Sequence, residues 1–211
     1  WFFPQKWQEY CDKYLTFENI TKEELQVFKE TFVKLMKISR YCTTGGDVYL
    51  SKNPPHTGRV KALVEMFPNA KFIYLMRNPY TVFESTRSFF TNTIKPLELQ
   101  HISDEEMEKN ILLTYTKLYR AYEEQKKYVP EGNLFEVKFE DFEADAFGTT
   151  KLAYEKLGIR EFDCAEAAIR QYTDRKKGYK KNKYEYKPRT IQLVNENWGY
   201  ALKDWDYEIH P

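Results

Sequence analysis

Residues 72–80 read Phe-Ile-Tyr-Leu-Met-Arg-Asn-Pro-Tyr, and this stretch decides the fold. The first five of these residues are almost wholly apolar, which is typical of a strand buried in a parallel sheet. Asn78 is a favourable N-cap and Pro79 suits the first turn of a helix, so the sequence predicts a helix from Pro79 to about Phe90. A buried strand that leads directly into a helix indicates an α/β fold.

The same alternation continues on both sides of this unit. Upstream, residues 48–51 form a short β-prone run, and Val60 opens the apolar face of a helix that Pro68 stops. Downstream, a capping box at Ser103 predicts a long helix, and residues 134–139 read as a third strand. Strands separated by helices require right-handed crossovers, so we expect a mainly parallel sheet with flanking helices.

The length of the chain, 211 residues, suits one well-cored domain better than two. We therefore treat residues 1–211 as a single domain. It has a helical segment over residues 1–44, an α/β core over residues 45–160, and a C-terminal helix with a basic and aromatic tail over residues 161–211. A capping box at Thr21 starts a helix in the first of these parts.

Composition excludes several classes of protein. Lys and Arg number 33 against 32 Asp and Glu, so no overall field favours nucleic acid or an anionic membrane. The three cysteines are odd in number and widely spaced, which argues against disulfides or a zinc site and favours a cytoplasmic location. No apolar run approaches the roughly 18 residues of a membrane-spanning helix.

Candidate binding residues follow from the sheet, because parallel sheets bind ligands beyond the carboxyl ends of their strands. Arg77 leaves such a strand at a helix N-terminus, where the helix dipole and unpaired backbone N–H groups favour an anion. Ser85 lies eight residues later, about 9 Å along the helix from its start, and could close a phosphate clamp. Taken alone, an arginine and a serine at these places are more often structural.

Lys52 and His56 come from the end of the neighbouring predicted strand. A lysine there can neutralise charge on a leaving oxygen, while a neutral imidazole can take a proton from an acceptor near pH 7. Arg59 is a further candidate for contact with an acceptor or a phosphate. Singly, each of these residues is more often a loop or surface residue, so the hypothesis depends on their combination.

Residues 50–59 and 67–85 together resemble the central block of PAPS-dependent sulfotransferases, in particular the bacterial type with a P-loop-NTPase-like fold. The resemblance implies that Arg77 and Ser85 bind the 3′-phosphate of PAPS, the co-substrate that donates the sulfuryl group. It also implies that Lys52 and His56 stand where the family has its strand-end lysine and nearby histidine, and that no metal is needed.

The rest of the chain extends this resemblance. Residues 135–142 and 157–159 are similar to the family's strand and helix behind the site, and Trp198 lies in a segment that looks like the family's C-terminal end. Four residues of the tail resemble the Arg-Lys-Gly loop that closes over the 3′-phosphate in cytosolic members: Arg175, Lys176, Lys177 and Gly178. A solvated charge run is the commoner explanation for such a stretch.

One family element is missing before Lys52. Sulfotransferases begin with a strand and a phosphate-binding loop that holds the 5′-phosphosulfate, and no such loop precedes Lys52. Residues 43–46, Thr-Thr-Gly-Gly, come nearest, but they precede a predicted strand instead of following one. We therefore expect an N-terminally incomplete fold whose donor loop lies upstream of Trp1 in a longer protein, and little transfer by this chain alone.

Two other classes of protein stay open at this stage. A P-loop phosphotransferase would share the architecture, but it needs a Gly-Lys-Ser/Thr loop and a magnesium-binding acidic strand end, which the sequence lacks. A non-catalytic helical interaction module would use the many aromatic residues as a binding surface. In the enzyme interpretation the acceptor is a small molecule or carbohydrate with a hydroxyl group, and the sequence does not distinguish among these.

Overall fold

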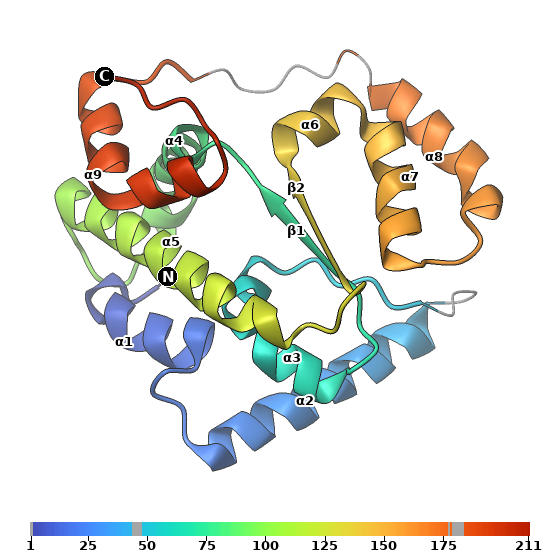
Figure 1. Ribbon diagram of the computed structural model, residues 1–211. Helices are drawn as coiled ribbons and strands as arrows, with labels where there is room; N and C mark the ends of the chain where they lie inside the picture. The colour runs from blue at the N-terminus through green and yellow to red at the C-terminus, as the bar shows by residue number, and fades with distance from the viewer. Residues whose placement is uncertain (1, 44–47, 177, 179–183) are drawn as a thin grey trace.

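The computed structural model describes residues 2–43, 48–176, 178 and 184–211 (Figure 1). Most of this part of the chain is helical, and it contains two strands. The helices are α1 (Trp7–Cys11), α2 (Lys22–Cys42), α3 (Val60–Met66), α4 (Pro79–Phe89), α5 (Asp104–Gln125), α6 (Phe139–Ala144), α7 (Ala146–Leu157), α8 (Phe162–Lys176) and α9 (Pro188–Asp204), and the strands are β1 (Phe72–Met76) and β2 (Leu134–Lys138).

The two strands form a parallel pair, as the sequence predicts. Phe72 of β1 faces Leu134 of β2, and the register continues without a break to Met76 and Lys138. The crossover between the strands contains α4 and α5 (Figure 1). The α/β class is therefore present, but within the described residues the sheet has two strands only, and a larger parallel sheet is not seen.

The two faces of β1 are covered unequally. Tyr74 stacks on Tyr122 of α5 with ring centroids 3.7 Å apart, and Met76 is buried on the same face. Ile73 and Leu75, on the other face, remain 54% and 47% exposed. The prediction of a strand buried on both sides is thus confirmed for one face and wrong for the other.

The predicted strand over residues 48–51 is also wrong. The segment forms no ladder with any described residue, and Val48 and Leu50 are 82% and 86% exposed. A strand is stabilised by its hydrogen-bonded neighbours, and β-prone residues without a neighbouring strand do not make one. Pro54 then starts a 3₁₀ turn that runs to Arg59 and leads into α3.

Most predicted helix ends are confirmed. Thr21 and Glu24 form both hydrogen bonds of a capping box, each 3.1 Å long, and Ser103 and Glu106 do the same at the start of α5. Gly158 ends α7 with a φ of 61°, the left-handed conformation that glycine adopts readily. Local side-chain chemistry thus sets these boundaries.

The main core lies where α4, α5 and α9 meet. Trp198 of α9 is fully buried, and its Nε1 donates to the carbonyl oxygen of Leu112 on α5 at 3.0 Å. Phe83 of α4 packs edge-on against the same indole, with centroids 5.7 Å apart. Trp198 therefore belongs to a helix that completes the core. Ion pairs and hydrogen bonds join the same three helices through Glu84, Arg87, Glu108, Arg189 and Thr190.

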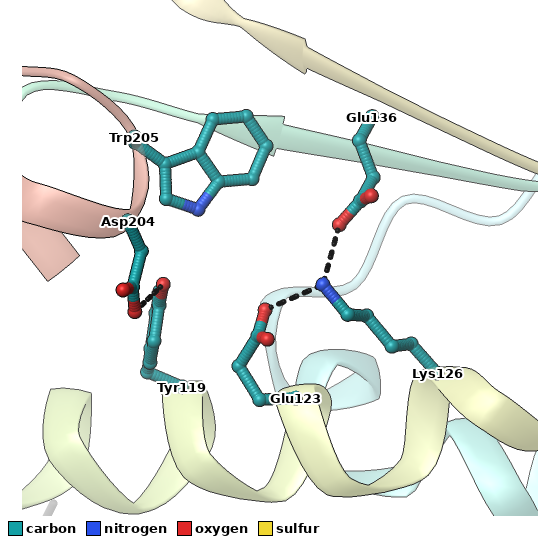
Figure 2. A pocket seen from close by; sticks show the side chains of 6 residues that line it. All are labelled: Tyr119, Glu123, Lys126, Glu136, Asp204 and Trp205. Carbon is teal, nitrogen blue, oxygen red and sulfur yellow. Dashed lines mark hydrogen bonds and ion pairs between the residues drawn. The ribbon is translucent and has the colours of Figure 1, made fainter.

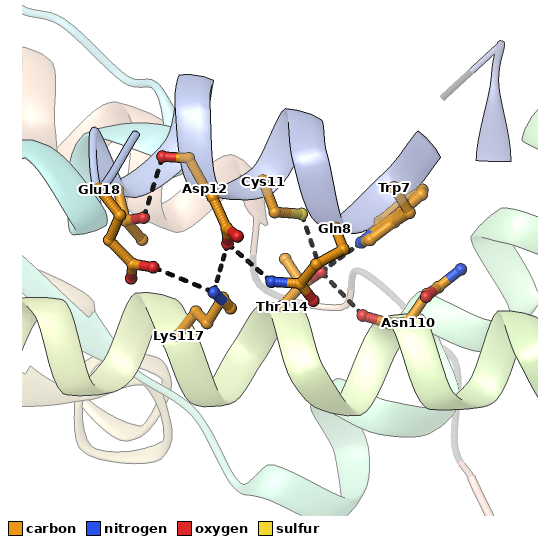
Figure 3. A network of polar contacts seen from close by, with 9 residues as sticks. Trp7, Gln8, Cys11, Asp12, Glu18, Asn110, Thr114 and Lys117 are labelled. Carbon is orange, nitrogen blue, oxygen red and sulfur yellow. Dashed lines mark hydrogen bonds and ion pairs between the residues drawn. The ribbon is translucent and has the colours of Figure 1, made fainter. Parts of the chain in front are cut away.

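The N-terminal helix is fastened to α5 by a polar network (Figure 3). Trp7 donates from Nε1 to Oγ1 of Thr114 at 2.7 Å, and Lys117 bonds to both Asp12 and Glu18. Burial raises the pKa of the Cys11 thiol, which packs beside Thr114. This arrangement positions the segment against which residues 54–59 pack.

None of the helices in the described part of the chain combines the length and the apolar character needed to cross a lipid bilayer.

Candidate functional site

Arg77 lies at the carboxyl end of β1, immediately before α4. Its guanidinium carbon stands 4.6 Å from the ring centroid of Phe139, the first residue after β2. The aromatic face supports the cation while leaving its N–H groups free to point elsewhere. A planar guanidinium at the carboxyl edge of a parallel sheet, beside a helix N-terminus, is suited to bind a phosphate.

The backbone amides at the start of α4 are engaged by Asn78. The Oδ1 atom of Asn78 accepts from the amides of Tyr80 and Thr81, at 3.0 and 3.4 Å, and the amide of Val82 donates to the carbonyl of Asn78. Pro79 has no amide hydrogen. The unpaired N–H groups expected here are therefore capped, which leaves the Arg77 guanidinium and the helix dipole to attract an anion.

Ser85 lies in the second turn of α4 and is partly buried. Its neighbour Glu84 is buried and accepts hydrogen bonds from Arg87 at 2.6 Å and from Thr190. These contacts fix the rotation of α4 about its axis. The structure thus places Arg77 and Ser85 on one strand–helix unit, with the rotation of the helix determined by the core.

His56 and Lys52 lie on the segment before α3. The Nε2 atom of His56 is 3.3 Å from Oγ of Ser51, and the ring meets Phe32 of α2 edge-on at 5.3 Å. Burial, with a smaller contribution from the charge of Arg59, lowers the pKa of His56, which favours the neutral imidazole that a general base requires. Lys52 is exposed.

Arg59 is directed toward the N-terminal segment. It donates to the carbonyl oxygen of Tyr14, and its guanidinium lies 5.0 and 5.2 Å from the rings of Phe17 and Phe28. Burial lowers its pKa to about 10. These contacts support a role for Arg59 in joining residues 54–59 to the N-terminal helices.

The described residues of the predicted closing loop lie at the end of α8 and just after it. Arg175 and Lys176 end α8, which packs against α7 and lies well away from α4 in Figure 1. The Nε atom of Arg175 donates to the carbonyl of Gln171 at 3.4 Å, and Gly178 has a φ of 96°. Lys177 lies outside the described residues.

A pocket beside the sheet has the wrong charge for an anionic donor (Figure 2). Lys126 bridges Glu123 and Glu136 at 2.9 and 3.3 Å, and Tyr119 donates to Asp204 at 3.0 Å. Three carboxylates against one ammonium group repel a phosphosulfate, and their hydrogen bonds are already made within the pocket. We therefore keep the site at the carboxyl edge of the sheet.

Sequence reasoning missed four residues that surround Arg77. They come from the end of β2 and from the segment after α9: Lys138, Phe139, Glu140 and Tyr207. A usable signal was present for the first three. Parallel strands end at the same edge, so the residues that follow both strands can be expected to meet. Tyr207 carries no comparable signal, because it reaches the site through the packing of α9.

The chain is similar to known sulfotransferases. The sequence profile of the sulfotransferase family matches residues 5–163. The chain is 31% identical over 211 residues to the omega-hydroxy-beta-dihydromenaquinone-9 sulfotransferase Stf3 of Mycobacterium bovis, and equally to the protein of that name in Mycobacterium tuberculosis. No solved structure gives a significant match.

Each of these two alignments covers 99% of this chain and 53% of the relative, so the chain spans about half the length of the curated relatives it matches. The family profile takes in β1, the Arg77 junction, all of α4 and β2. It runs from before α1 to the first two residues of α8. The chain therefore belongs to the sulfotransferase family.

Proposed function

We propose that the full-length protein transfers the sulfuryl group of PAPS to an acceptor hydroxyl by in-line displacement. The observation that carries the proposal is the position of Arg77: a guanidinium supported by Phe139, at the carboxyl end of a parallel strand and the start of α4, inside the region that matches the family. In the proposed complex Arg77 and Ser85 hold the 3′-phosphate of PAPS.

The transfer breaks the bond between the sulfur and the bridging oxygen of PAPS and forms a bond between that sulfur and the acceptor oxygen. We assign the acceptor proton to His56, whose lowered pKa keeps it neutral and able to accept. Lys52 neutralises the charge that develops on the bridging oxygen as adenosine 3′,5′-bisphosphate leaves. The 5′-phosphosulfate is not assigned to any described residue.

The acceptor in this proposal is a small molecule with a hydroxyl group. The support is the name of the mycobacterial relatives, which refers to a hydroxylated menaquinone. A carbohydrate hydroxyl remains the alternative, and competition between the two kinds of acceptor in a turnover assay distinguishes them. We place the reaction in the cytoplasm on the cysteine pattern of the sequence.

The experiment compares two nucleotides that differ only in the 3′-phosphate. In the full-length protein, Arg77→Ala should weaken binding of adenosine 3′,5′-bisphosphate by about 10- to 150-fold, because a charge-assisted hydrogen bond contributes roughly 1.5 to 3 kcal/mol. Binding of adenosine 5′-phosphate should change little. Isothermal titration calorimetry measures both affinities.

Arg120→Ala provides the matched control, because Arg120 is an exposed arginine on α5 whose guanidinium lies over the ring of Tyr200. It removes the same charge and should affect neither nucleotide. Equal losses for the two nucleotides in Arg77→Ala would contradict the assignment of Arg77 to the 3′-phosphate. Absence of labelled sulfuryl transfer from PAPS to any hydroxyl acceptor would contradict the proposed reaction.

A further inference from the structure

Beyond the ends of β1 and β2, two side-chain contacts join residues with the same separation along the chain as the paired residues of the strands. Within the sheet each β1 residue faces the β2 residue 62 positions later, and the same separation joins Asn78 to Glu140. The backbone amide of Asn78 donates to Oε1 of Glu140 at 3.1 Å. One position earlier, the guanidinium of Arg77 lies over the ring of Phe139. Two successive residues after β2 therefore hold the two residues that follow β1.

Glu140 is itself held at both carboxylate oxygens. Oε2 accepts from the hydroxyl of Tyr207 at 2.7 Å, while Oε1 faces the Asn78 amide. Burial and the hydrogen bond to Glu140 raise the pKa of Tyr207, so its hydroxyl stays protonated and continues to donate. Lys138 fixes the ring of Tyr207 from the other side, with Nζ 4.9 Å from the centroid.

The charge of Glu140 does not suit an anion site. A carboxylate close to a bound phosphate weakens binding through like-charge repulsion, and the effect grows where solvent is excluded. The two hydrogen bonds explain in another way why a glutamate stands at position 140. They fix the peptide plane between Arg77 and Asn78, which sets the direction in which the Arg77 side chain leaves the backbone.

We propose that Glu140 is a positioning residue for the 3′-phosphate site: by binding the Asn78 amide and Tyr207 together it fixes the backbone at Arg77, whose guanidinium Phe139 supports. The inference rests on the proposed function of Arg77. The residues involved were given no role in the sequence analysis. The expected change in bisphosphate affinity is opposite in sign to the change that charge repulsion alone would cause. Loss of the carboxylate should weaken phosphate binding, although a negative charge has been removed.

The experiment measures affinities for adenosine 3′,5′-bisphosphate and adenosine 5′-phosphate in three variants of the full-length protein. Glu140→Ala should weaken the bisphosphate roughly tenfold and leave the monophosphate nearly unchanged, since only the former has the group that Arg77 holds. Glu140→Gln should recover most of this loss, because its amide oxygen can still accept from the Asn78 amide.

Asp141→Ala is the matched control. Asp141 is the next residue on α6, is exposed, and its charge, like that of Glu140, raises the pKa of Tyr207. Its removal should leave bisphosphate affinity unchanged or slightly higher. Bisphosphate affinity that rises in Glu140→Ala as it does in Asp141→Ala would overturn the proposal, since Glu140 would then act by charge alone. Equal losses for both nucleotides in Glu140→Ala would overturn it as well.

A double variant separates this inference from the proposed function. If Glu140 acts through Arg77, adding Glu140→Ala to Arg77→Ala should cause no further loss of bisphosphate affinity. Independent, additive losses would overturn the positioning role while leaving the Arg77 assignment intact. If Arg77→Ala weakens binding of the bisphosphate and the monophosphate equally, the proposed function fails first, and the positioning role fails with it.

Tyr207→Phe keeps the experiment informative if Glu140→Ala does not fold. This variant removes one of the two hydrogen bonds of Glu140 and preserves the aromatic ring between Lys138 and α6. It should lower bisphosphate affinity by roughly threefold, with monophosphate affinity unchanged. Unchanged affinity for both nucleotides in Tyr207→Phe would contradict the proposed chain of contacts.

Discussion

The edge at Arg77 and the segment that carries Lys52 and His56 differ in how the chain holds them. The guanidinium of Arg77 lies over Phe139, Glu140 accepts from both the Asn78 amide and Tyr207, and the Asn78 side chain caps α4. The other segment has a single turn packed on aromatic rings, preceded by apolar side chains that face solvent. The half of the proposed site at Arg77 is therefore preorganised, whereas the half with Lys52 and His56 has fewer side-chain contacts.

The two halves are therefore suited to different roles within the described residues. Binding a phosphate requires a rigid set of donors, and the Arg77 edge provides that rigidity through contacts distant in sequence. Proton transfer requires the base to meet the acceptor, and His56 lies on a segment that begins with exposed side chains. The predictions below test this contrast.

The largest expected effect concerns His56. His56→Ala should lower turnover of a hydroxyl acceptor by roughly 100- to 10,000-fold in the full-length protein, because the variant has no general base at that position. Affinity for adenosine 3′,5′-bisphosphate should stay within about twofold of the original, since the Arg77 edge is built without His56. Steady-state kinetics and calorimetry measure the two quantities, and a parallel fall in both would break the contrast between the halves.

The pH dependence of turnover sharpens the same comparison. Because burial lowers the pKa of His56 below its ordinary 6.5, the neutral base persists as the pH falls, and the acidic limb of kcat should lie below pH 6.5. The folded state also binds this proton less readily than the unfolded state, so His56 makes folding less favourable as the pH drops below that value. An acidic limb above pH 7 would contradict the assignment.

Stability should separate the two regions by several kcal/mol. Trp198→Ala should lower the free energy of unfolding by about 3 to 5 kcal/mol, since Trp198 is fully buried where α4, α5 and α9 meet. Leu50→Ser should change it by less than about 0.5 kcal/mol, because Leu50 is 86% exposed. Urea titrations measure both values. A large loss in the free energy of unfolding in Leu50→Ser would mean that Leu50 is buried by another part of the full-length protein.

Gly58 tests how closely the open segment is fitted to the N-terminal helices. A Cβ atom at Gly58 would stand 2.5 Å from the carbonyl oxygen of Leu15 and 2.9 Å from Leu118, so Gly58→Ala should cost about 1 to 3 kcal/mol of stability. Gly199→Ala is the control, since no atom lies within 4 Å of a Cβ there and alanine favours the helix. Thermal unfolding of the two variants should shift in opposite directions.

The smallest effect is expected at the cap of α4. Asn78→Ala removes the acceptor for the Tyr80 and Thr81 amides and should cost roughly 1 kcal/mol of stability. Asn78→Asp retains an acceptor and should lose little. Freed amides at a helix N-terminus favour anions. The loss in free energy of phosphate binding in Asn78→Ala should therefore be smaller than the loss in free energy of unfolding. A larger loss of phosphate affinity would indicate that the cap positions Arg77 directly.

The elements that sequence reasoning located are those set by neighbouring residues. The β1–α4 junction and the caps at Thr21, Ser103 and Gly158 depend on side chains within a few positions of the backbone they stabilise. The expected strand at residues 48–51 failed because a strand depends on a partner, which local pattern does not reveal.

The candidate site divides in the same way. Arg77 and Ser85 were located by their spacing on one strand–helix unit, whereas the roles of Glu140 and Tyr207 depend on a parallel register and on the docking of α9. The basic tail was predicted from its resemblance to the family's Arg-Lys-Gly loop, and its role stays a prediction, with Arg175 and Lys176 at the end of α8.

The uninterrupted register between β1 and β2 has an evolutionary consequence. Because the guanidinium of Arg77 lies over Phe139 and the amide of Asn78 binds Glu140, residues of the two junctions should be selected in pairs. Substitutions at 139 should correlate with those at 77, and substitutions at 140 with those at 78 and 207, across related sequences. The crossover between the strands is free to change in length, since an insertion there leaves both facing pairs in place. Covariation should therefore be strong among the positions at the sheet edge and weak between those positions and the crossover.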